Sequence, residues 1–263
     1  MAKVIAIAGE SGSGKTCCAS LIIRSLLKHR ALPILAIDAG AGAELGKRLG
    51  LNAGVMLDTV ISQFDRKKTK MPAGVLKKGW LDFKLYDAIT ESNDVDLVTL
   101  GAGWGRGCNC FTFDALGSFI EKLSGNYRFI VIDDALDFLR LKYGTIKHID
   151  DLIVVSNHSI AAIGSTNKNL LPKDLKSDET HISLIINMAP QSGTNPILAR
   201  ALTFLGCEPS GSIPWDDQIA QRCLTQSPLT ELPDTSIAAQ AIEPFINQLL
   251  SNYWPEGRES RDN

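Results

Sequence analysis

The chain alternates short, nearly continuous apolar runs with longer segments in which apolar residues recur at helical spacing. The short runs predict strands at residues 3–8, 33–37, 96–100, 129–132, 152–155, 182–186 and, as an edge strand, 202–205. Helical spacing is found at residues 17–29, 113–123 and 237–250, and residues 52–93 form a more polar helical region. Since the strands are apolar on both faces, we expect an α/β fold with a mostly parallel sheet between helix layers.

The first apolar run leads directly into a glycine-rich loop, GESGSGKT at residues 9–16, which matches G-x-x-x-x-G-K-[ST]. Glycines let successive backbone N–H groups turn toward one anion, and the N-terminus of the following helix adds its partial positive charge. The alternative is a glycine-rich turn that binds nothing. The pattern predicts a P-loop nucleotide site built from Gly12, Ser13, Gly14, Lys15, Thr16 and Cys17.

Within this loop, Lys15 is expected to reach the β- and γ-phosphates of ATP or ADP, and the Thr16 hydroxyl to hold Mg²⁺. The run IVID at residues 130–133 ends a predicted strand in a carboxylate, which is the Walker B form. We therefore expect Asp133 to be the second magnesium ligand, although a strand ending in a solvated acid is the alternative. Lys15, Asp38 and Asp133 are the candidate catalytic residues.

Composition limits the classes of partner. The 263 residues show neither an internal repeat nor a low-complexity linker, so we expect one nucleotide-binding domain over residues 1–254 and a flexible tail at 255–263. A net charge of −2 gives no electrostatic basis for binding nucleic acid. Neither an apolar run long enough to span a membrane nor a signal-peptide pattern is found, so we expect a cytoplasmic protein without membrane association.

Six cysteines in a reducing compartment predict packing, metal ligation or reactivity rather than a disulfide framework. Cys108 and Cys110 are spaced so that both thiols can face one ion, and two copies of the pair across a twofold axis would give the four ligands of a tetrahedral site. This hypothesis predicts a homodimer with Zn²⁺ or Ni²⁺, or an Fe–S cluster, at its interface; the alternative is a pair of buried thiols. Cys207 and Cys223 have no partner spacing and are interpreted as structural.

Taken together, the P-loop, LAID at residues 35–38, GCNC at 107–110 and IVID at 130–133 resemble the carbon monoxide dehydrogenase accessory (CooC-like) ATPases. That family belongs to the deviant-Walker-A group with MinD, ParA and the nitrogenase iron protein, and the resemblance covers about residues 3–225. It implies an ATP-dependent homodimer that holds a metal between its two C-x-C pairs and inserts nickel into a client metalloenzyme similar to carbon monoxide dehydrogenase. It also implies that Asn187 and Pro214 contact the adenine.

The chain departs from the family pattern at three positions, one of which is Asp137, where the family has glycine. Glu10 stands where the family has a lysine that reaches the partner's phosphates, and Gly40 replaces the second acid of Asp-x-Asp-Pro. We therefore expect slow hydrolysis, and in the extreme a nucleotide-responsive binding or scaffold protein. A conventional P-loop ATPase assisted by Asp38 or Asp133 is the alternative, and a small-molecule kinase is less favoured because no arginine-rich lid is evident.

A run of basic residues, Arg66, Lys67, Lys68, Lys70, Lys77 and Lys78, lies in the polar middle region. It is interpreted as a solvated helical face, with docking of an acidic client as the alternative.

Overall fold

The computed structural model describes residues 1–71, 77–102, 110–133, 148–159, 180–190 and 209–253. In these residues one sheet has seven parallel strands in the order β3-β2-β4-β1-β5-β6-β7, which confirms the expected α/β fold. The strands are β1 (Lys3–Gly9), β2 (Ile34–Asp38), β3 (Val95–Thr99), β4 (Phe129–Asp133), β5 (Asp151–Asn157), β6 (His181–Ala189) and β7 (Gly211–Pro214).

The last strand differs from the prediction. The expected edge strand at 202–205 lies outside the described residues, whereas β7 was not predicted. It has only four residues, of which Ile213 alone is buried, so it lacks the apolar run that marks the other strands.

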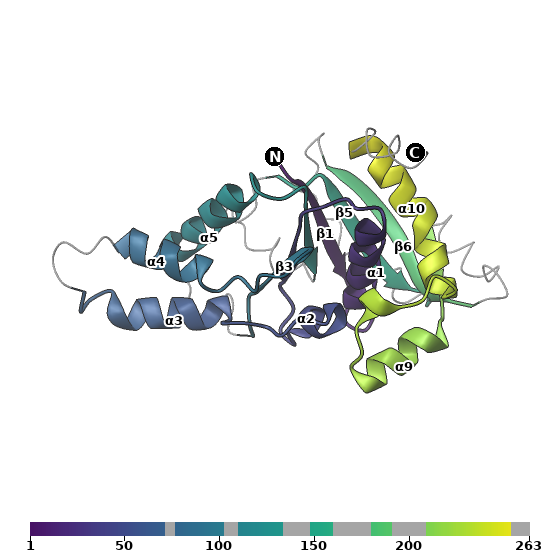
Figure 1. The fold of residues 1–263 in the computed structure, drawn as a ribbon, viewed down its shortest axis with the longest axis horizontal. Helices are drawn as coiled ribbons and strands as arrows, with labels where there is room; N and C mark the ends of the chain where they lie inside the picture. The colour runs from purple at the N-terminus through teal and green to yellow at the C-terminus, as the bar shows by residue number, and fades with distance from the viewer. Residues whose placement is uncertain (72–76, 103–109, 134–147, 160–179, 191–208, 254–263) are drawn as a thin grey trace.

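Helices connect and cover the strands (Figure 1). They are α1 (Lys15–Lys28), α2 (Glu44–Leu49), α3 (Leu57–Lys67), α4 (Lys77–Tyr86), α5 (Cys110–Leu123), α9 (Asp217–Thr225), the 3₁₀ turn η1 (Leu229–Glu231) and α10 (Ile237–Tyr253). None of the helices in the described ranges combines the length and the apolar character that a bilayer crossing requires.

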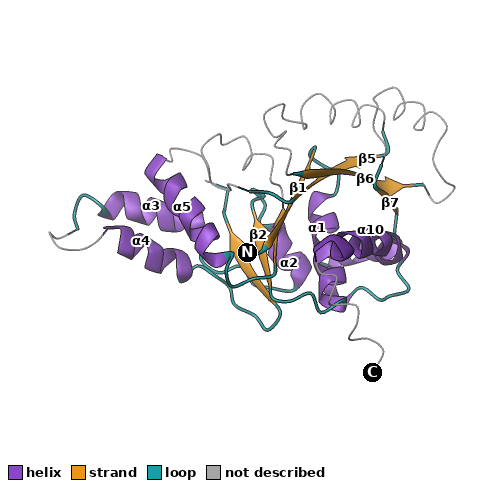
Figure 2. Ribbon diagram, turned by 90° about the horizontal axis from the view of Figure 1, so that it is seen from above, coloured by secondary structure: helices purple, strands orange, loops and turns teal. Residues whose placement is uncertain are grey.

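Successive side chains of each strand face opposite sides of the sheet, so two apolar cores form. Ile5 and Ile7 of β1 pack with α1, α2 and α10, which lie along one face (Figure 2). Val4 and Ala6 belong to the second core, with buried residues of α3, α4 and α5. Burial on both faces explains why the strand sequences are nearly continuous in Val, Ile and Leu.

Helices α3, α4 and α5 extend from one end of the sheet (Figure 1). Phe64 stacks on Trp80 with ring centroids 5.9 Å apart, and Tyr86 meets Phe119 edge-on at 5.1 Å. The basic residues singled out in the sequence lie at the end of α3 and the start of α4, where Lys77 and Lys78 are exposed, as expected for a solvated face.

Asp216 joins β7, α9 and α10. Its carboxylate caps α9 by accepting from the Gln218 N–H at 2.8 Å, and it also accepts from the Ser236 hydroxyl and the Ala238 N–H at the start of α10. Burial alone would raise the pKa of Asp216, but these hydrogen bonds lower it below its ordinary value. The negative charge is therefore favoured by folding and ties two helices to the edge of the sheet.

Replacing Asp216 with Ala removes a helix cap and leaves buried donors unpaired, so it should lower the free energy of unfolding by roughly 2 kcal/mol near neutral pH. Chemical denaturation of the variant and of the exposed neighbour Asp217→Ala provides the comparison; the latter should lose less than about 1 kcal/mol. Because the folded pKa of Asp216 is depressed, its contribution is present above the unfolded value of 3.8 and is lost as pH falls through the lower folded value. Equal losses in both variants would contradict the assigned role.

Candidate nucleotide-binding site

The candidate site lies where parallel strands end together. Gly9 at the end of β1 pairs in register with Val155 of β5, and Asn157 at the end of β5 pairs with Asn187 of β6. On the other side of β1, Asp38 and Asp133 end β2 and β4 side by side. The carboxyl edge of a parallel sheet is the usual ligand site of such folds, because its loops and helix N-termini converge there.

The conformation of the glycine loop depends on close approaches to β5 and β6. A Cβ atom at Gly9 would collide with the carbonyl oxygen of Val155. Gly14 caps α1 with a φ of 87°, and a Cβ there would collide with the Asn187 side chain. Asn187 also donates from Nδ2 to the carbonyl oxygen of Ser13 at 2.9 Å. Glycine is therefore required at both positions, and Asn187 fastens the loop to the sheet.

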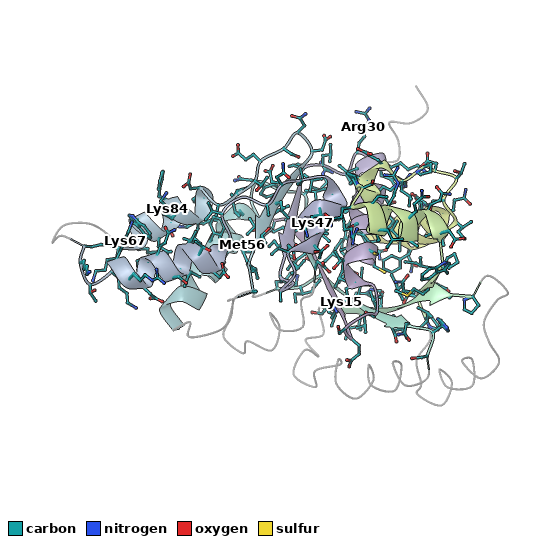
Figure 3. The ribbon with its side chains drawn as sticks, turned by 90° about the horizontal axis from the view of Figure 1, so that it is seen from below. Lys15, Arg30, Lys47, Met56, Lys67 and Lys84 are labelled. Carbon is teal, nitrogen blue, oxygen red and sulfur yellow. The ribbon has the colours of Figure 1, made fainter. Side chains whose placement is uncertain are left out.

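Lys15 begins α1, at the opposite end of this helix from Arg30 (Figure 3). Its ammonium group donates to the carbonyl oxygen of Glu10 at 3.1 Å, so the side chain folds back over the loop. The helix starts without a side-chain cap. An uncapped helix N-terminus beside an ammonium group favours a bound anion, as the sequence predicts for this loop.

The two candidate acids differ in their surroundings, although each is only 1% exposed. Asp38 accepts from the backbone N–H groups of Gly40 at 3.1 Å and Leu45 at 2.8 Å, and therefore shapes the turn between β2 and α2. Asp133 lies near the first turn of α1: burial and, second, the negative charge of Asp133 raise the pKa of Cys18 to about 12.

A buried carboxylate near the first turn of α1, the turn that contains Thr16, offers oxygen atoms of the kind that Mg²⁺ takes as ligands. The residues present at this edge of the sheet thus fit the magnesium ion that P-loop sites use. Thr16 and Asp133 would hold it, and the remaining ligands would come from phosphate oxygens and water.

A cavity of about 190 Å³ adjoins the loop. It contains both residues for which adenine contact is expected, Asn187 and Pro214. The other lining residues are Cys17, Leu21, Met188, Ile213, Trp215, Asp216, Ile219, Ala220 and Cys223. Its apolar walls and small volume suit a flat heterocycle better than a phosphate chain.

Some residues that line this cavity were not predicted from the sequence. Trp215, which is 50% exposed, was not predicted to line it, although the apolar run before the helix-capping Asp216 was a usable signal. Cys223 was interpreted as structural because it has no partner spacing in the sequence. In the structure its sulfur lies 3.8 Å from the sulfur of Cys17, a contact that spacing along the chain could not reveal.

The predicted C-x-C metal site is not described. Cys108 lies outside the described residues, Cys110 is the first residue of α5 and its side chain is not described, and Cys207 also lies outside them. Among the described residues, no group of three or more His, Cys, Asp or Glu side chains could hold a metal ion.

Comparison with known proteins adds a fold assignment. The chain is 25% identical over 251 residues to an uncharacterised ATP-binding protein of Methanocaldococcus jannaschii, covering 94% of this chain and 98% of that protein. A search against protein-family profiles gives no match.

Two solved structures resemble it closely in shape. One is the septum site-determining protein MinD of Pyrococcus horikoshii in complex with Mg-ADP, with a TM-score of 0.64, 23% identity and coverage of 95% and 96% of the two chains. The other is a ParA family ATPase of Chlorobium tepidum, with a TM-score of 0.70, 19% identity and coverage of 94% and 98%. The chain therefore has the fold of the MinD and ParA P-loop ATPases.

Proposed function

We propose that the protein binds ATP with Mg²⁺, hydrolyses it slowly, and uses the nucleotide to control the geometry of a homodimer. The observation that carries this proposal is the position of Asn187. Its amide anchors the glycine loop through the Ser13 carbonyl and also lines the adjoining cavity. A phosphate cradle and a base-sized cavity therefore share one wall. The name of the M. jannaschii relative and the Mg-ADP bound to P. horikoshii MinD support the same ligand.

In this proposal the backbone N–H groups of residues 12–17 surround the phosphates, and the base enters the cavity between Asn187 and Pro214. Lys15 exchanges the Glu10 carbonyl for phosphate oxygens, which are stronger acceptors for an ammonium group. Thr16 and Asp133 hold Mg²⁺, which when bound supplies positive charge to the phosphate oxygens. Catalysis of phosphoryl transfer is mainly positioning and charge neutralisation, so these residues form the core of the machinery.

Three features favour slow hydrolysis. Glu10 places a carboxylate in the loop where a positive charge would aid the reaction, and Gly40 offers no side chain to orient water. Asp38 accepts backbone hydrogen bonds with both of its carboxylate oxygens. It is therefore occupied in holding the turn after β2 in this conformation, and nucleotide-driven rearrangement of that turn would be needed before it could assist.

Replacing Asn187 with Ala should weaken ATP binding about tenfold. The variant loses one buried hydrogen bond and one cavity contact, and a tenfold change in Kd corresponds to about 1.4 kcal/mol of binding free energy. Isothermal titration calorimetry with Mg-ATP measures the change. Asn93→Ala, at an exposed turn far along the chain, is the matched control and should bind as wild type does. Unchanged affinity in Asn187→Ala, with the control also unchanged, would show that this amide does not join the two subsites.

Exchanging Glu10 for Lys should raise steady-state ATP turnover by at least about tenfold, because a repulsive contact with polyphosphate becomes attractive, worth a few kcal/mol at about 4 Å. Phosphate release at saturating Mg-ATP is the measurement. Glu10→Gln serves as the control, since it removes the charge without supplying a cation, and should give a smaller gain. If both variants turn over at the wild-type rate, Glu10 is not what limits hydrolysis.

The GCNC sequence at residues 107–110 favours a second, linked role. We propose that the C-x-C pairs of two protomers hold one Zn²⁺ or Ni²⁺ ion and that ATP governs its delivery to a client. The resemblance to CooC-like ATPases makes this client a nickel-cluster enzyme of the carbon monoxide dehydrogenase type. Thiolates in pairs suit the softer divalent ions, which supports a cargo of this kind.

Cys108→Ser should abolish retention of Zn²⁺, which wild type should hold at about one ion per two chains if four thiolates complete the site. Elemental analysis after exhaustive dialysis, with the mass in solution measured in parallel, gives the ratio. Cys207→Ser is the matched control, because this cysteine has no C-x-C partner. Metal content and dimerisation that are the same in Cys108→Ser and wild type would refute the shared site.

A further inference from the structure

Two cysteines that are far apart in the sequence meet at the base cavity. Cys17 lies in the first turn of α1, directly after the glycine loop, and Cys223 lies near the end of α9. Their sulfur atoms are 3.8 Å apart although 206 positions separate them in the chain. Both side chains line the cavity and both are partly exposed, so a small molecule in solvent can reach them.

The surroundings make the two thiols unequal. Arg48 donates from Nη1 to the carbonyl oxygen of Cys223 at 3.3 Å, which places a positive charge beside this residue. The hydrogen bond shared with Cys17 lowers the pKa of Cys223; burial opposes this effect, the charge of Arg48 assists it, and the charge of Glu44, which lies 3.7 Å from Arg48, opposes it. The same hydrogen bond and burial raise the pKa of Cys17. Of the two thiols, Cys223 is therefore the one that more readily forms the nucleophilic thiolate.

Cys18 offers the contrasting case one residue away. It is fully buried in the core between α1 and the sheet, and burial raises the pKa of its thiol to about 12. A buried neutral thiol is inert toward oxidants in solvent. Reactivity is therefore confined, among the cysteines whose side chains are described, to the pair at the cavity.

We propose that Cys17 and Cys223 form an oxidisable dithiol site in the wall of the base cavity, which hydrogen peroxide converts to a disulfide. The Cys223 thiolate attacks one peroxide oxygen; an S–O bond forms, the O–O bond breaks, and the released hydroxide is protonated to water. Cys17 then attacks the Cys223 sulfur; the S–S bond forms, the S–O bond breaks, and the departing hydroxide takes the Cys17 proton. Two thiols lose two electrons, and one peroxide becomes two waters.

Closing the bond requires the sulfur atoms to approach by roughly 1.8 Å, from 3.8 Å to the roughly 2.0 Å of a disulfide. Helix α1 is held by core residues such as Leu21 and Ile22, whereas α9 has no buried residue. The approach therefore moves α9 toward α1, and since both helices line the cavity, it narrows the space for the base. This consequence rests on the proposed function, whereas formation of the disulfide does not.

If the cavity takes the base, oxidation should weaken ATP binding, because the nucleotide and the S–S bond favour different separations of α1 and α9. Bound ATP should also slow disulfide formation, because the base occupies the cavity that α9 must narrow to bring the two sulfur atoms together. Under oxidative conditions the disulfide would therefore lower the affinity of the protein for ATP. A thiol reductant would open the S–S bond and restore that affinity.

The test treats the reduced full-length protein with increasing hydrogen peroxide and maps disulfides by non-reducing peptide mass spectrometry. A Cys17–Cys223 linked peptide is expected as the first product, formed more slowly with Mg-ATP present. Titration of Mg-ATP into the same samples should give a Kd raised about tenfold on oxidation and restored by dithiothreitol. In Cys223→Ser the Kd should not respond to peroxide, whereas the matched variant Cys18→Ala should respond as wild type does.

Absence of the linked peptide, or its formation only after other cysteine pairs, overturns the dithiol site. A linked peptide that leaves the Kd unchanged overturns its control of nucleotide binding. If the reduced protein does not bind ATP, the proposed function fails, and the peptide map still decides whether the dithiol site exists.

Discussion

The structure depends on the close contact of the glycine loop with two parallel strands. Gly9 approaches the backbone of β5 and Gly14 approaches the Asn187 side chain of β6, so tightly that a single Cβ atom at either position would collide. β1 can make both approaches because it lies beside β5 in the sheet and ends at the same level as Val155. The geometry of the candidate anion site is therefore set by the sheet register as well as by the loop sequence.

Asp38 and Asp133 both lie at this edge of the sheet, but their surroundings differ. Strand register places Asp38 and Asp133 next to each other. The carboxylate of Asp38 accepts hydrogen bonds from the backbone of the following turn, whereas Asp133 lies close enough to Cys18 of α1 for its charge to raise the pKa of that thiol. If the protein hydrolyses ATP as proposed, Gly40 leaves the carboxylate of Asp38 both to hold the turn after β2 and to aid the reaction. A stable turn and fast hydrolysis would then compete for the same oxygens.

The sequence predicts what depends on local pattern. Strands buried on both faces, the glycine loop and the acid that ends β4 all follow from contiguous residues, and the structure has them close to the expected bounds. The resemblance to a known family supplied Asn187 and Pro214, which the fold brings to one cavity. Strand β7 was not predicted from the sequence, because a four-residue edge strand has too few buried positions to form a hydrophobic pattern. The contact of Cys17 with Cys223 was not predicted either, because it arises from packing between segments that are far apart in the sequence.

The wall formed by α9 is the part of the site that the core constrains least. Only the partly buried Ile219 packs against the core, and the other contacts are polar: the Asp216 cap, the bond from Arg48 to the Cys223 carbonyl, and those from Arg222 to the carbonyls of Pro228 and Glu231. Apart from the Asp216 cap, these contacts are part-buried or exposed hydrogen bonds, which cost less to rearrange than an apolar core. The glycine loop is held between strands, whereas the cavity proposed for the base has one side that the core constrains little. In the proposed function, a change that acts on α9 would therefore alter nucleotide affinity without disturbing Thr16 and Asp133, the proposed Mg²⁺ ligands.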